Sequence, residues 1–268
     1  MSARLRAQAQ AWLQQGQAAQ WVEVVQAQGS VPREVGTRML VSEQEVLGTI
    51  GGGHLEWQAI AKARARLNPA ARPDEHEDWP VSLGPTLGQC CGGALVLRFS
   101  ALSAASLAAW PAEPPRFVLQ LHGAGHVGRA IAKLLADLPC EVLWVDERDD
   151  EFPAEPGPPH IHRCATEQAE AEVARAPTGA FFLVLTHRHD LDLRITEAIL
   201  RRDDFAFFGL IGSASKRAGF ERRLRDRGIP AEALPRMHCP IGLAGLSGKA
   251  PEVLAISVVA QLLQASSQ

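Results

Sequence analysis

The sequence predicts an α/β protein of two domains: a C-terminal Rossmann-like doubly wound parallel sheet and a smaller N-terminal α/β domain. In the second half of the 268 residues, uninterrupted apolar runs alternate with helical patterns, as is typical of parallel strands buried on both faces. A proline-rich stretch between the halves disfavours regular structure. We therefore expect an N-terminal domain over 1–110, a linker over 111–116 and the Rossmann-like domain over 117–268.

The N-terminal half is expected to combine helices with short strands. Helical spacing of apolar residues predicts one helix over 3–19 and a second over 55–67, behind three glycines. The stretch 69–80 is acidic and contains proline, so we expect a surface loop there. β-rich runs predict strands at 21–25, 38–42, 45–50 and 94–99, with the middle two forming a hairpin.

The C-terminal half is expected to alternate strands and helices. Continuous apolar runs predict strands at 117–121, 141–145, 180–186 and 205–211. Helical patterns predict helices at 127–138, 215–227 and 251–264. Pro251 stands in the first turn of the last helix, where its missing N–H removes no hydrogen bond.

Composition and charge narrow the possible functions. The formal charge is 27 minus 30, or −3, without a long basic run, so nucleic-acid binding is not expected. The first residues lack the apolar core of a signal peptide, and no apolar run is long enough to span a membrane. We expect a cytoplasmic protein without membrane contact. Five scattered cysteines without CxxC spacing argue against a disulfide framework or structural zinc.

A dinucleotide-type glycine fingerprint opens the second domain. Gly123, Gly125 and Gly128 follow a predicted strand and begin a helix, where backbone N–H groups and the helix dipole favour an anion. Asp146 ends the next predicted strand, at the place of a ribose-binding acid. The pattern predicts strand–turn–helix better than it predicts a ligand. NAD(P), another phosphate ligand and an empty loop all stay open.

A second glycine cluster lies in the first domain. Gly51, Gly52 and Gly53 precede a helix and can form a nest of N–H groups for a phosphate or oxyanion. Arg33 and Arg38 can offer planar guanidinium groups to the same anion. His54 begins the helix and is a further candidate contact, although a capping or packing role is equally consistent with its position. The alternative is a sharp turn with two surface arginines.

Three further segments carry chemical groups. Cys90 and Cys91 stand among glycines, where a soft thiolate suits molybdenum or sulfur transfer, or else a small buried thiol. The stretch 186–192, THRHDLD, follows a predicted strand and suits either proton transfer or a hydrogen-bond network, while its metal signal is weak. Lys216 follows GLIGSAS at a helix start, where it suits a phosphate or simply solvent.

Taken together and in this order, these segments resemble the XdhC/CoxI family, the accessory proteins of xanthine dehydrogenase maturation. The combination is far more specific than GxGxxG alone. The matching segments are GSVPREVGTRM (29–39), GTIGGGHLE (48–56), GQCCGG (88–93), HGAGHVGRA (122–130), THRHDLD (186–192), GLIGSASKR (209–217), CPIGL (239–243) and GKAPE (248–252).

The resemblance implies an accessory factor and not an enzyme. Such a protein would hold the molybdenum cofactor (molybdopterin) during sulfuration and insert it into apo-xanthine dehydrogenase. A cysteine desulfurase as sulfur donor and a homo-oligomer, such as a dimer, are implied as partners. The candidate cofactor-binding residues are Arg33, Arg38, Gly51, Gly52, Gly53, His54, Cys90, Cys91, Gly123, Gly125, Gly128, Asp146 and Lys216, with Cys90 or Cys91 the candidate molybdenum contact.

Two other functions stay in competition with the chaperone. An NAD(P)-dependent oxidoreductase or a nucleotide-sensing module would use the GxGxxG domain and Asp146. Against the first, the chain offers no Ser/Tyr/Lys set for reducing a substrate and contains no tyrosine. The second leaves the glycine cluster at 51–53 and the paired cysteines without a role.

Overall fold

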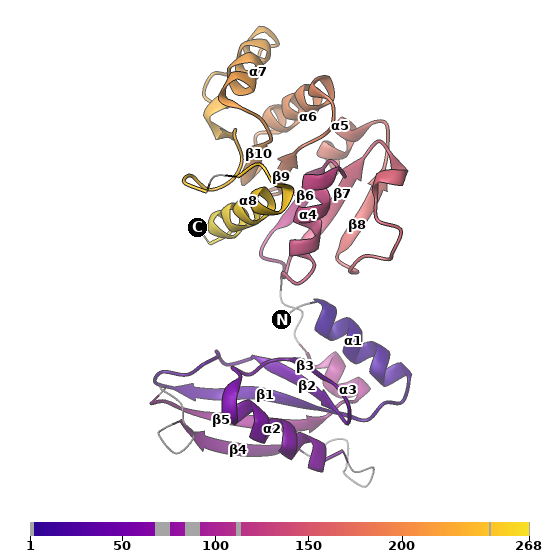
Figure 1. The fold of residues 1–268 in the computed structure, drawn as a ribbon, viewed down its shortest axis with the longest axis vertical. Coiled ribbons are helices and arrows are strands. Elements are labelled where there is room, and N and C mark those ends of the chain that lie inside the picture. Colours follow the sequence, from indigo (N-terminus) through magenta and orange to yellow (C-terminus); the bar gives the residue numbers. More distant parts are fainter. Residues whose placement is uncertain (1–2, 68–75, 84–91, 111–113, 247, 268) are drawn as a thin grey trace. The chain divides into compact units, whose positions relative to one another are not determined.

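The computed structural model describes residues 3–67, 76–83, 92–110, 114–246 and 248–267 (Figure 1). The chain divides into two compact units, Met1–Glu113 and Pro114–Gln268. Among the described residues, no helix combines the length and the apolar character needed to cross a membrane.

The N-terminal unit is an antiparallel sheet with helices on both faces. Its described strands pair in the order β3-β2-β1-β5-β4. Trp21 and Leu40 pack under helix α1, whereas their neighbours Val22 and Met39 join the core that contains Leu55 of α2, because successive side chains of a strand point to opposite faces. The elements are α1 (Ala3–Gln14), β1 (Ala19–Gln28), β2 (Arg38–Ser42), β3 (Val46–Gly48), α2 (Gly53–Ala65), β4 (Glu77–Ser82), β5 (Ala94–Ala101) and α3 (Ala104–Ala108).

The prediction of a surface loop at 69–80 is wrong for residues 77–80. Residues Glu77–Ser82 form β4, which pairs with β5 along the edge of the sheet. Pro80 obscured this strand in the sequence, but an edge strand tolerates proline because one side of it needs no ladder hydrogen bonds. Residues 69–75 lie outside the described residues. The hairpin of β2 and β3 is confirmed by their antiparallel pairing.

The C-terminal unit confirms the predicted doubly wound parallel sheet. Its described strands run in the order β11-β10-β9-β6-β7-β8, and every pair is parallel. Helices α4 and α8 cover one face, while α5, α6 and α7 cover the other. The elements are β6 (Val118–His122), α4 (His126–Leu135), β7 (Glu141–Asp146), η2 (Asp149–Glu151), β8 (Ile161–Ala165), α5 (Ala169–Glu172), η3 (Val173–Arg175), β9 (Phe181–Val184), α6 (His189–Arg202), β10 (Phe207–Leu210), α7 (Ala214–Asp226), η4 (Leu234–Arg236), β11 (Met237–His238) and α8 (Pro251–Ala265).

The sequence analysis did not predict four helices and strands of this unit: β8, α5, α6 and β11. Strand β8 lies at the sheet edge and only Ile161 in it is fully buried, so it lacks the continuous apolar run of a central strand. Helix α6 begins inside the THRHDLD stretch with Arg188 at its N-cap and no side-chain cap. Because no capping residue marks the start of this helix, its polar first turn does not indicate a helix in the sequence.

Candidate functional site

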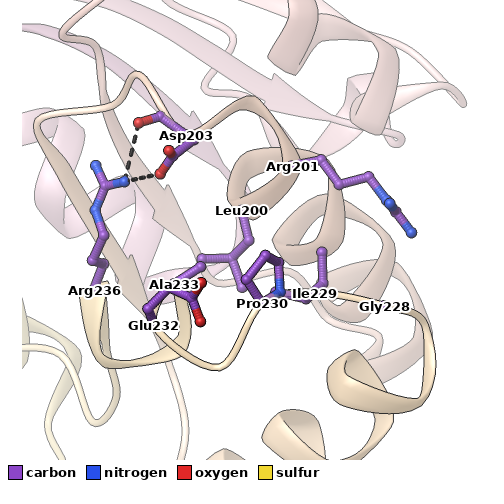
Figure 2. Close-up of a pocket in the computed structure, with 9 residues that line it drawn as sticks. All are labelled: Leu200, Arg201, Asp203, Gly228, Ile229, Pro230, Glu232, Ala233 and Arg236. Atoms are coloured by element: carbon purple, nitrogen blue, oxygen red, sulfur yellow. Dashed lines mark hydrogen bonds and ion pairs between the residues drawn. The ribbon is translucent and has the colours of Figure 1, made fainter.

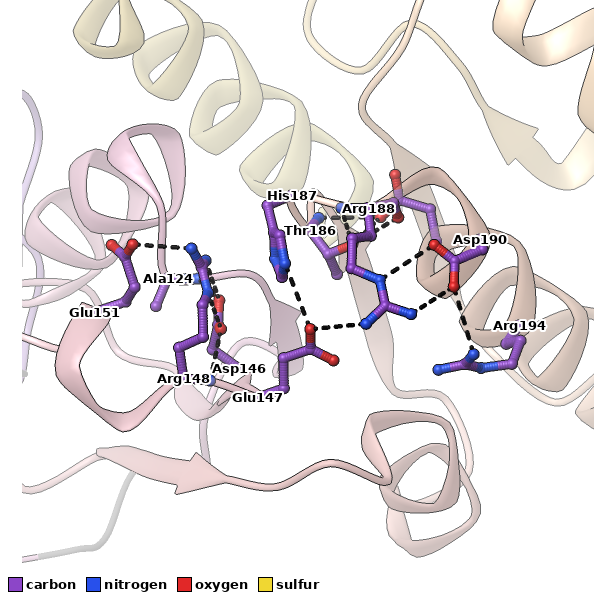
Figure 3. Close-up of polar contacts among 11 residues, drawn as sticks. Ala124, Asp146, Glu147, Arg148, Glu151, Thr186, His187, Arg188, Asp190 and Arg194 are labelled. Atoms are coloured by element: carbon purple, nitrogen blue, oxygen red, sulfur yellow. Dashed lines mark hydrogen bonds and ion pairs between the residues drawn. The ribbon is translucent and has the colours of Figure 1, made fainter.

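The strand order places a candidate crevice at the carboxyl ends of β6 and β9. The chain winds outward from β6 through β7 to β8 in one direction and from β9 through β10 to β11 in the other. Ligands of open α/β sheets bind at such a reversal point. Three segments end there: the glycine loop after β6, the 146–148 segment at the end of β7 and the Thr186–Arg188 loop after β9 (Figure 3).

The three glycines of the fingerprint differ in how closely neighbouring atoms surround them. A Cβ on Gly123 would lie 2.4 Å from the carbonyl oxygen of Leu185, and one on Gly128 would lie 2.0 Å from that of Gly123. Both positions therefore need glycine for packing alone. Gly125 has φ of −67°, and a Cβ added to it would meet no atom within 4 Å. Only the middle glycine borders open space.

Asp146 is already fully engaged by its own chain. Its carboxylate accepts the Ala124 N–H at 2.6 Å and two N–H groups of the Arg148 guanidinium at 3.0 and 3.1 Å (Figure 3). Burial alone would raise the pKa of Asp146, but these hydrogen bonds outweigh it and hold the pKa below its ordinary value. The carboxylate is not free for ribose hydroxyls, so this acid does not fit NAD(P) as it stands.

A chain of ion pairs joins the β7 and β9 loops. Glu147 accepts from Arg188 at 3.2 Å and lies 3.4 Å from the Nε2 atom of His187, and Arg188 also binds Asp190 at 2.6 Å. Arg194 approaches the same Asp190 carboxylate at 3.6 Å (Figure 3). The hydrogen bond from Arg188 lowers the pKa of Asp190 to about 2. The HxHD stretch therefore behaves here as a hydrogen-bond network that shapes the loop.

Lys216 makes a buried ion pair beside this network. Its ammonium lies 2.5 Å from Asp192, whose side chain is 0% exposed, and donates to the carbonyl of Ile211 at 2.8 Å. The other Asp192 oxygen accepts from the Thr186 N–H at 3.0 Å and from its hydroxyl at 2.7 Å. The pair thus ties together the loop after β9, helix α6 and the start of α7. A phosphate at Lys216 would have to displace Asp192.

In the N-terminal unit, three motif segments meet at one end of the sheet. A Cβ on Gly51 would lie 2.5 Å from the Pro32 ring, and one on Gly93 would lie 2.5 Å from the carbonyl oxygen of Ser30. The Gly93 N–H also donates to Ser30 at 3.2 Å. Cys90 and Cys91 lie outside the described residues; in the sequence they precede Gly93 by three and two residues.

The predicted anion nest holds a carboxylate of the chain itself. Gly51, Gly52 and Gly53 all have positive φ, of 125°, 75° and 67°. The N–H groups of Ile50 and Gly52 donate to one oxygen of Glu56 at 2.9 and 3.0 Å. The hydroxyl of Thr49 donates to the same oxygen at 2.5 Å. The nest therefore has the predicted chemistry, but Glu56 from the first turns of α2 occupies these donors.

The two candidate arginines and His54 differ in availability. Arg38 binds Glu23 at 2.9 Å and lies over the Trp110 ring at 5.2 Å, so both its charge and its plane are engaged. Arg33 is exposed and has no ion pair among the described residues. His54 is exposed and stacks on Trp57, with ring centroids 5.6 Å apart. Sequence reasoning missed Trp57, although its helical spacing already places it opposite the buried face of α2.

A pocket of about 660 Å³ lies away from the crevice, where α6 ends (Figure 2). Its polar wall is the ion pair of Arg236 with Asp203, and Asp203 comes before the amino end of β10. This is the opposite edge from the one at which parallel sheets bind ligands. Among the described residues, no group of three His, Cys, Asp or Glu is arranged to hold a metal ion.

Comparisons with known proteins cover both units. A model of the XdhC Rossmann domain matches residues 119–262, and a model of the XdhC and CoxI family matches residues 12–73. The Escherichia coli K12 protein YqeB is 30% identical over 247 residues, which make up 90% of this chain and 42% of that protein. The chain thus spans less than half of that relative.

A solved structure shares the fold. A crystal structure described as a xanthine dehydrogenase from Bacillus halodurans aligns with a TM-score of 0.74 and 18% identity. The alignment covers 99% of this chain and 96% of that one.

Proposed function

The chain belongs to the XdhC and CoxI family, and on that premise we propose that it is an accessory factor in the maturation of a xanthine dehydrogenase. The molybdenum cofactor is its cargo: the protein binds it, shields it during sulfuration and delivers it to the apo-enzyme. A cysteine desulfurase supplies the sulfur. The protein turns over no substrate of its own and works in the cytoplasm as a homo-oligomer.

The observation that carries this proposal is the meeting of three motif segments in the N-terminal unit. The turn at Ser30–Arg33, the glycines 51–53 and Gly93 come together at one end of the sheet. Arg33 there is exposed and without an ion pair among the described residues, so its guanidinium is available to a phosphate. A surface of glycines with an arginine that has no ion pair among the residues described suits an anionic cargo that must be both held and released.

We assign different tasks to the candidate residues. Arg33 binds the terminal phosphate directly. Arg38, held by Glu23 and Trp110, fixes the strand that follows this turn. Cys90 or Cys91 approaches the molybdenum, where a thiolate is a suitable soft ligand. Within the Rossmann-like unit, Gly125 borders open space, where its backbone can approach an anionic group.

A nucleotide-binding role is the second candidate, and a specific observation favours it. The strand order and the open Gly125 are those of a dinucleotide-binding loop. Against it, the acid that would hold the ribose is covered by Arg148 and Ala124. NAD(H) binding is therefore the outcome to look for if the cargo does not bind.

The test is binding of purified molybdenum cofactor, followed by transfer to apo-xanthine dehydrogenase. Stoichiometric binding with recovery of dehydrogenase activity supports the carrier. Arg33→Ala should weaken binding about ten- to a hundredfold, because a charge-assisted hydrogen bond contributes roughly 1.5–3 kcal/mol. Arg222→Ala, which removes an exposed arginine of α7, is the matched control and should bind as the wild type does.

Two results would contradict parts of the proposal. Absence of cofactor binding together with tight NAD(H) binding would replace the carrier with a nucleotide-dependent enzyme or sensor. If the double variant Cys90→Ala, Cys91→Ala still activated the apo-enzyme fully, the thiols would have no role in handling molybdenum.

A further inference from the structure

Trp57 differs from the other tryptophans of the chain in its exposure to solvent. Its side chain is 65% exposed, whereas four others are 6% exposed or less: Trp12, Trp21, Trp110 and Trp144. The buried face of α2 consists of Leu55, Ala59 and Ala63, and Trp57 is two residues from both of the first two. At 100° per residue it therefore lies on the outer face of the helix. Packing of the core does not explain an indole at this position.

The neighbouring imidazole orients this indole. His54 and Trp57 stand one turn apart, and their rings stack at 5.6 Å with an interplanar angle of 19°. His54 in turn contacts the amide nitrogen of Gln58 at 2.9 Å. Side chains on a helix lean toward its N-terminus, so the indole extends over the first turn of α2. His54 stacks against the indole, and the 65% exposed area of Trp57 leaves room for another planar group.

The start of α2 brings this aromatic pair toward the turn at Ser30–Arg33 and the glycines 51–53. Gly53 begins the helix, and a Cβ added to Gly52 would meet no atom within 4 Å. Next to them, the Arg33 side chain passes 3.7 Å from the Cβ position of Gly51. Trp57 and Arg33 thus lie near the same glycine turn: Trp57 is one turn into the helix that begins there, and Arg33, without an ion pair among the described residues, lies beside Gly51. This combination fits a ligand with a flat heteroaromatic ring and an anionic tail.

We propose that Trp57 is the stacking platform for the pterin ring of the cargo, with His54 holding the indole in place and Arg33 receiving the anionic tail. This inference rests on the proposed function and deepens it by naming the residue that binds the ring. Stacking suits a carrier because it depends on ring area and little on hydrogen-bond direction. The cargo can then be released without breaking a buried polar network.

The test uses a stable probe, neopterin monophosphate, titrated into the full-length protein; the fluorescence anisotropy of the pterin gives the dissociation constant for the wild type and every variant, and indole emission is followed in the wild type. Trp57 is the tryptophan most open to solvent among the described residues, so stacking should quench its emission. We expect Trp57→Ala and Trp57→Leu to raise the dissociation constant about tenfold, because losing one stacked aromatic costs roughly that much. Trp57→Phe, which keeps a ring, should raise it only about twofold.

Val35→Ala provides the matched control. Val35 is 57% exposed on the same unit and has no ring, so its loss should leave pterin affinity unchanged. All of these side chains are exposed, and circular dichroism should show wild-type folding for each variant. The same variants are then loaded with molybdenum cofactor and assayed for transfer to apo-xanthine dehydrogenase.

The outcomes separate this inference from the proposed function. If wild-type protein binds neither the probe nor the cofactor, both fail. If the wild type binds both and Trp57→Ala and Trp57→Leu bind them equally well, the platform is wrong and the carrier stands. If these variants bind pterin normally but no longer transfer the cofactor, Trp57 contacts the partner enzyme, as exposed tryptophans at protein interfaces do, and the platform is again overturned.

Discussion

The two glycine-rich turns of this protein look alike in sequence and differ in structure. Each connects a strand to a helix, and in each a carboxylate of the chain itself accepts loop N–H groups: Glu56 for the turn at 51–53 and Asp146 for the turn at 123–128. Glu56 comes from the helix that the turn begins. Asp146 comes from the neighbouring strand and is locked by Arg148.

The difference lies in the charges around each turn. Both turns contain a glycine that leaves no room for a Cβ, Gly51 in one and Gly128 in the other, and both contain a glycine that borders open space, Gly52 and Gly125. In the Rossmann-like unit the surrounding loops are joined by buried or bridging ion pairs, whereas in the N-terminal unit the nearby Arg33 is unpaired among the described residues. A glycine motif thus marks a closely packed stretch of backbone. Only the charges around the motif show whether its N–H groups are free to bind an anion.

The largest expected effect is at the buried Asp192–Lys216 pair, in the unit whose loops are joined by ion pairs. Lys216→Met leaves the Asp192 carboxylate buried without its cation, and breaking such a pair costs about 3–5 kcal/mol. Urea unfolding should show a correspondingly lower midpoint. The double variant Lys216→Met, Asp192→Asn should recover much of the loss, since it removes the unpaired charge. Equal stability of the two variants would show that the charge of Asp192 is compensated elsewhere.

This pair also shows what the sequence could and could not predict. The alternation of apolar runs and the glycine fingerprint predicted the parallel sheet, and Lys216 and the THRHDLD stretch were both recognised as chemically notable. Their mutual contact depends on the carboxyl ends of β9 and β10 lying side by side, which no spacing in the sequence encodes. For the same reason the occupation of Asp146 by Arg148 was not foreseeable, because it is set by a side-chain rotamer.

Other features of the candidate site were within reach of the sequence. The 3.6-residue period places Trp57 opposite Leu55 and Ala59 without any structure. Glu56 stands four residues after Gly52, close enough for a side chain at the start of a helix to fold back on the turn. Cys90 and Cys91 lie outside the described residues, so their assignment stays a prediction.

The second prediction compares two glycines of the same fingerprint. Gly128→Ala would place a methyl group 2.0 Å from the Gly123 carbonyl oxygen, so the backbone must shift. Such overpacking costs about 3 kcal/mol in the free energy of unfolding. Gly125→Ala meets no atom within 4 Å at an ordinary φ of −67° and should be nearly neutral in thermal unfolding. A large loss in Gly125→Ala would show that this loop is packed as tightly as its neighbours.

The third prediction contrasts the histidines beside the two turns, His122 before Gly123 and His54 after Gly53. Burial lowers the pKa of His122 to about 3 from an ordinary value of 6.5. The unfolded chain therefore binds this proton between pH 6.5 and 3 and the folded chain does not. Stability is complete above pH 6.5 and falls by about 1.4 kcal/mol per unit below it, or roughly 2 kcal/mol at pH 5.

Denaturant unfolding between pH 8 and 5 measures this slope. His122→Gln removes the titrating group and should therefore reduce the pH dependence of the free energy of unfolding, whatever its effect on stability at pH 8. His54→Gln changes an exposed side chain and should retain the wild-type slope. An unchanged slope in His122→Gln would assign the acid sensitivity to other groups.

The smallest expected effect on stability is at Glu56. It bears most directly on whether the turn at 51–53 can bind an anion. Glu56→Ala leaves the N–H groups of Ile50 and Gly52 without their carboxylate, and because both hydrogen bonds are only partly buried the loss of stability should be only about 1 kcal/mol. The same change vacates an anion nest of positive-φ glycines. Affinity for inorganic phosphate, measured by calorimetry, should therefore rise, with Glu56→Gln in between because its amide oxygen still accepts. If phosphate affinity stays the same in both variants, the nest serves only to begin α2, and anion binding in this unit depends on Arg33.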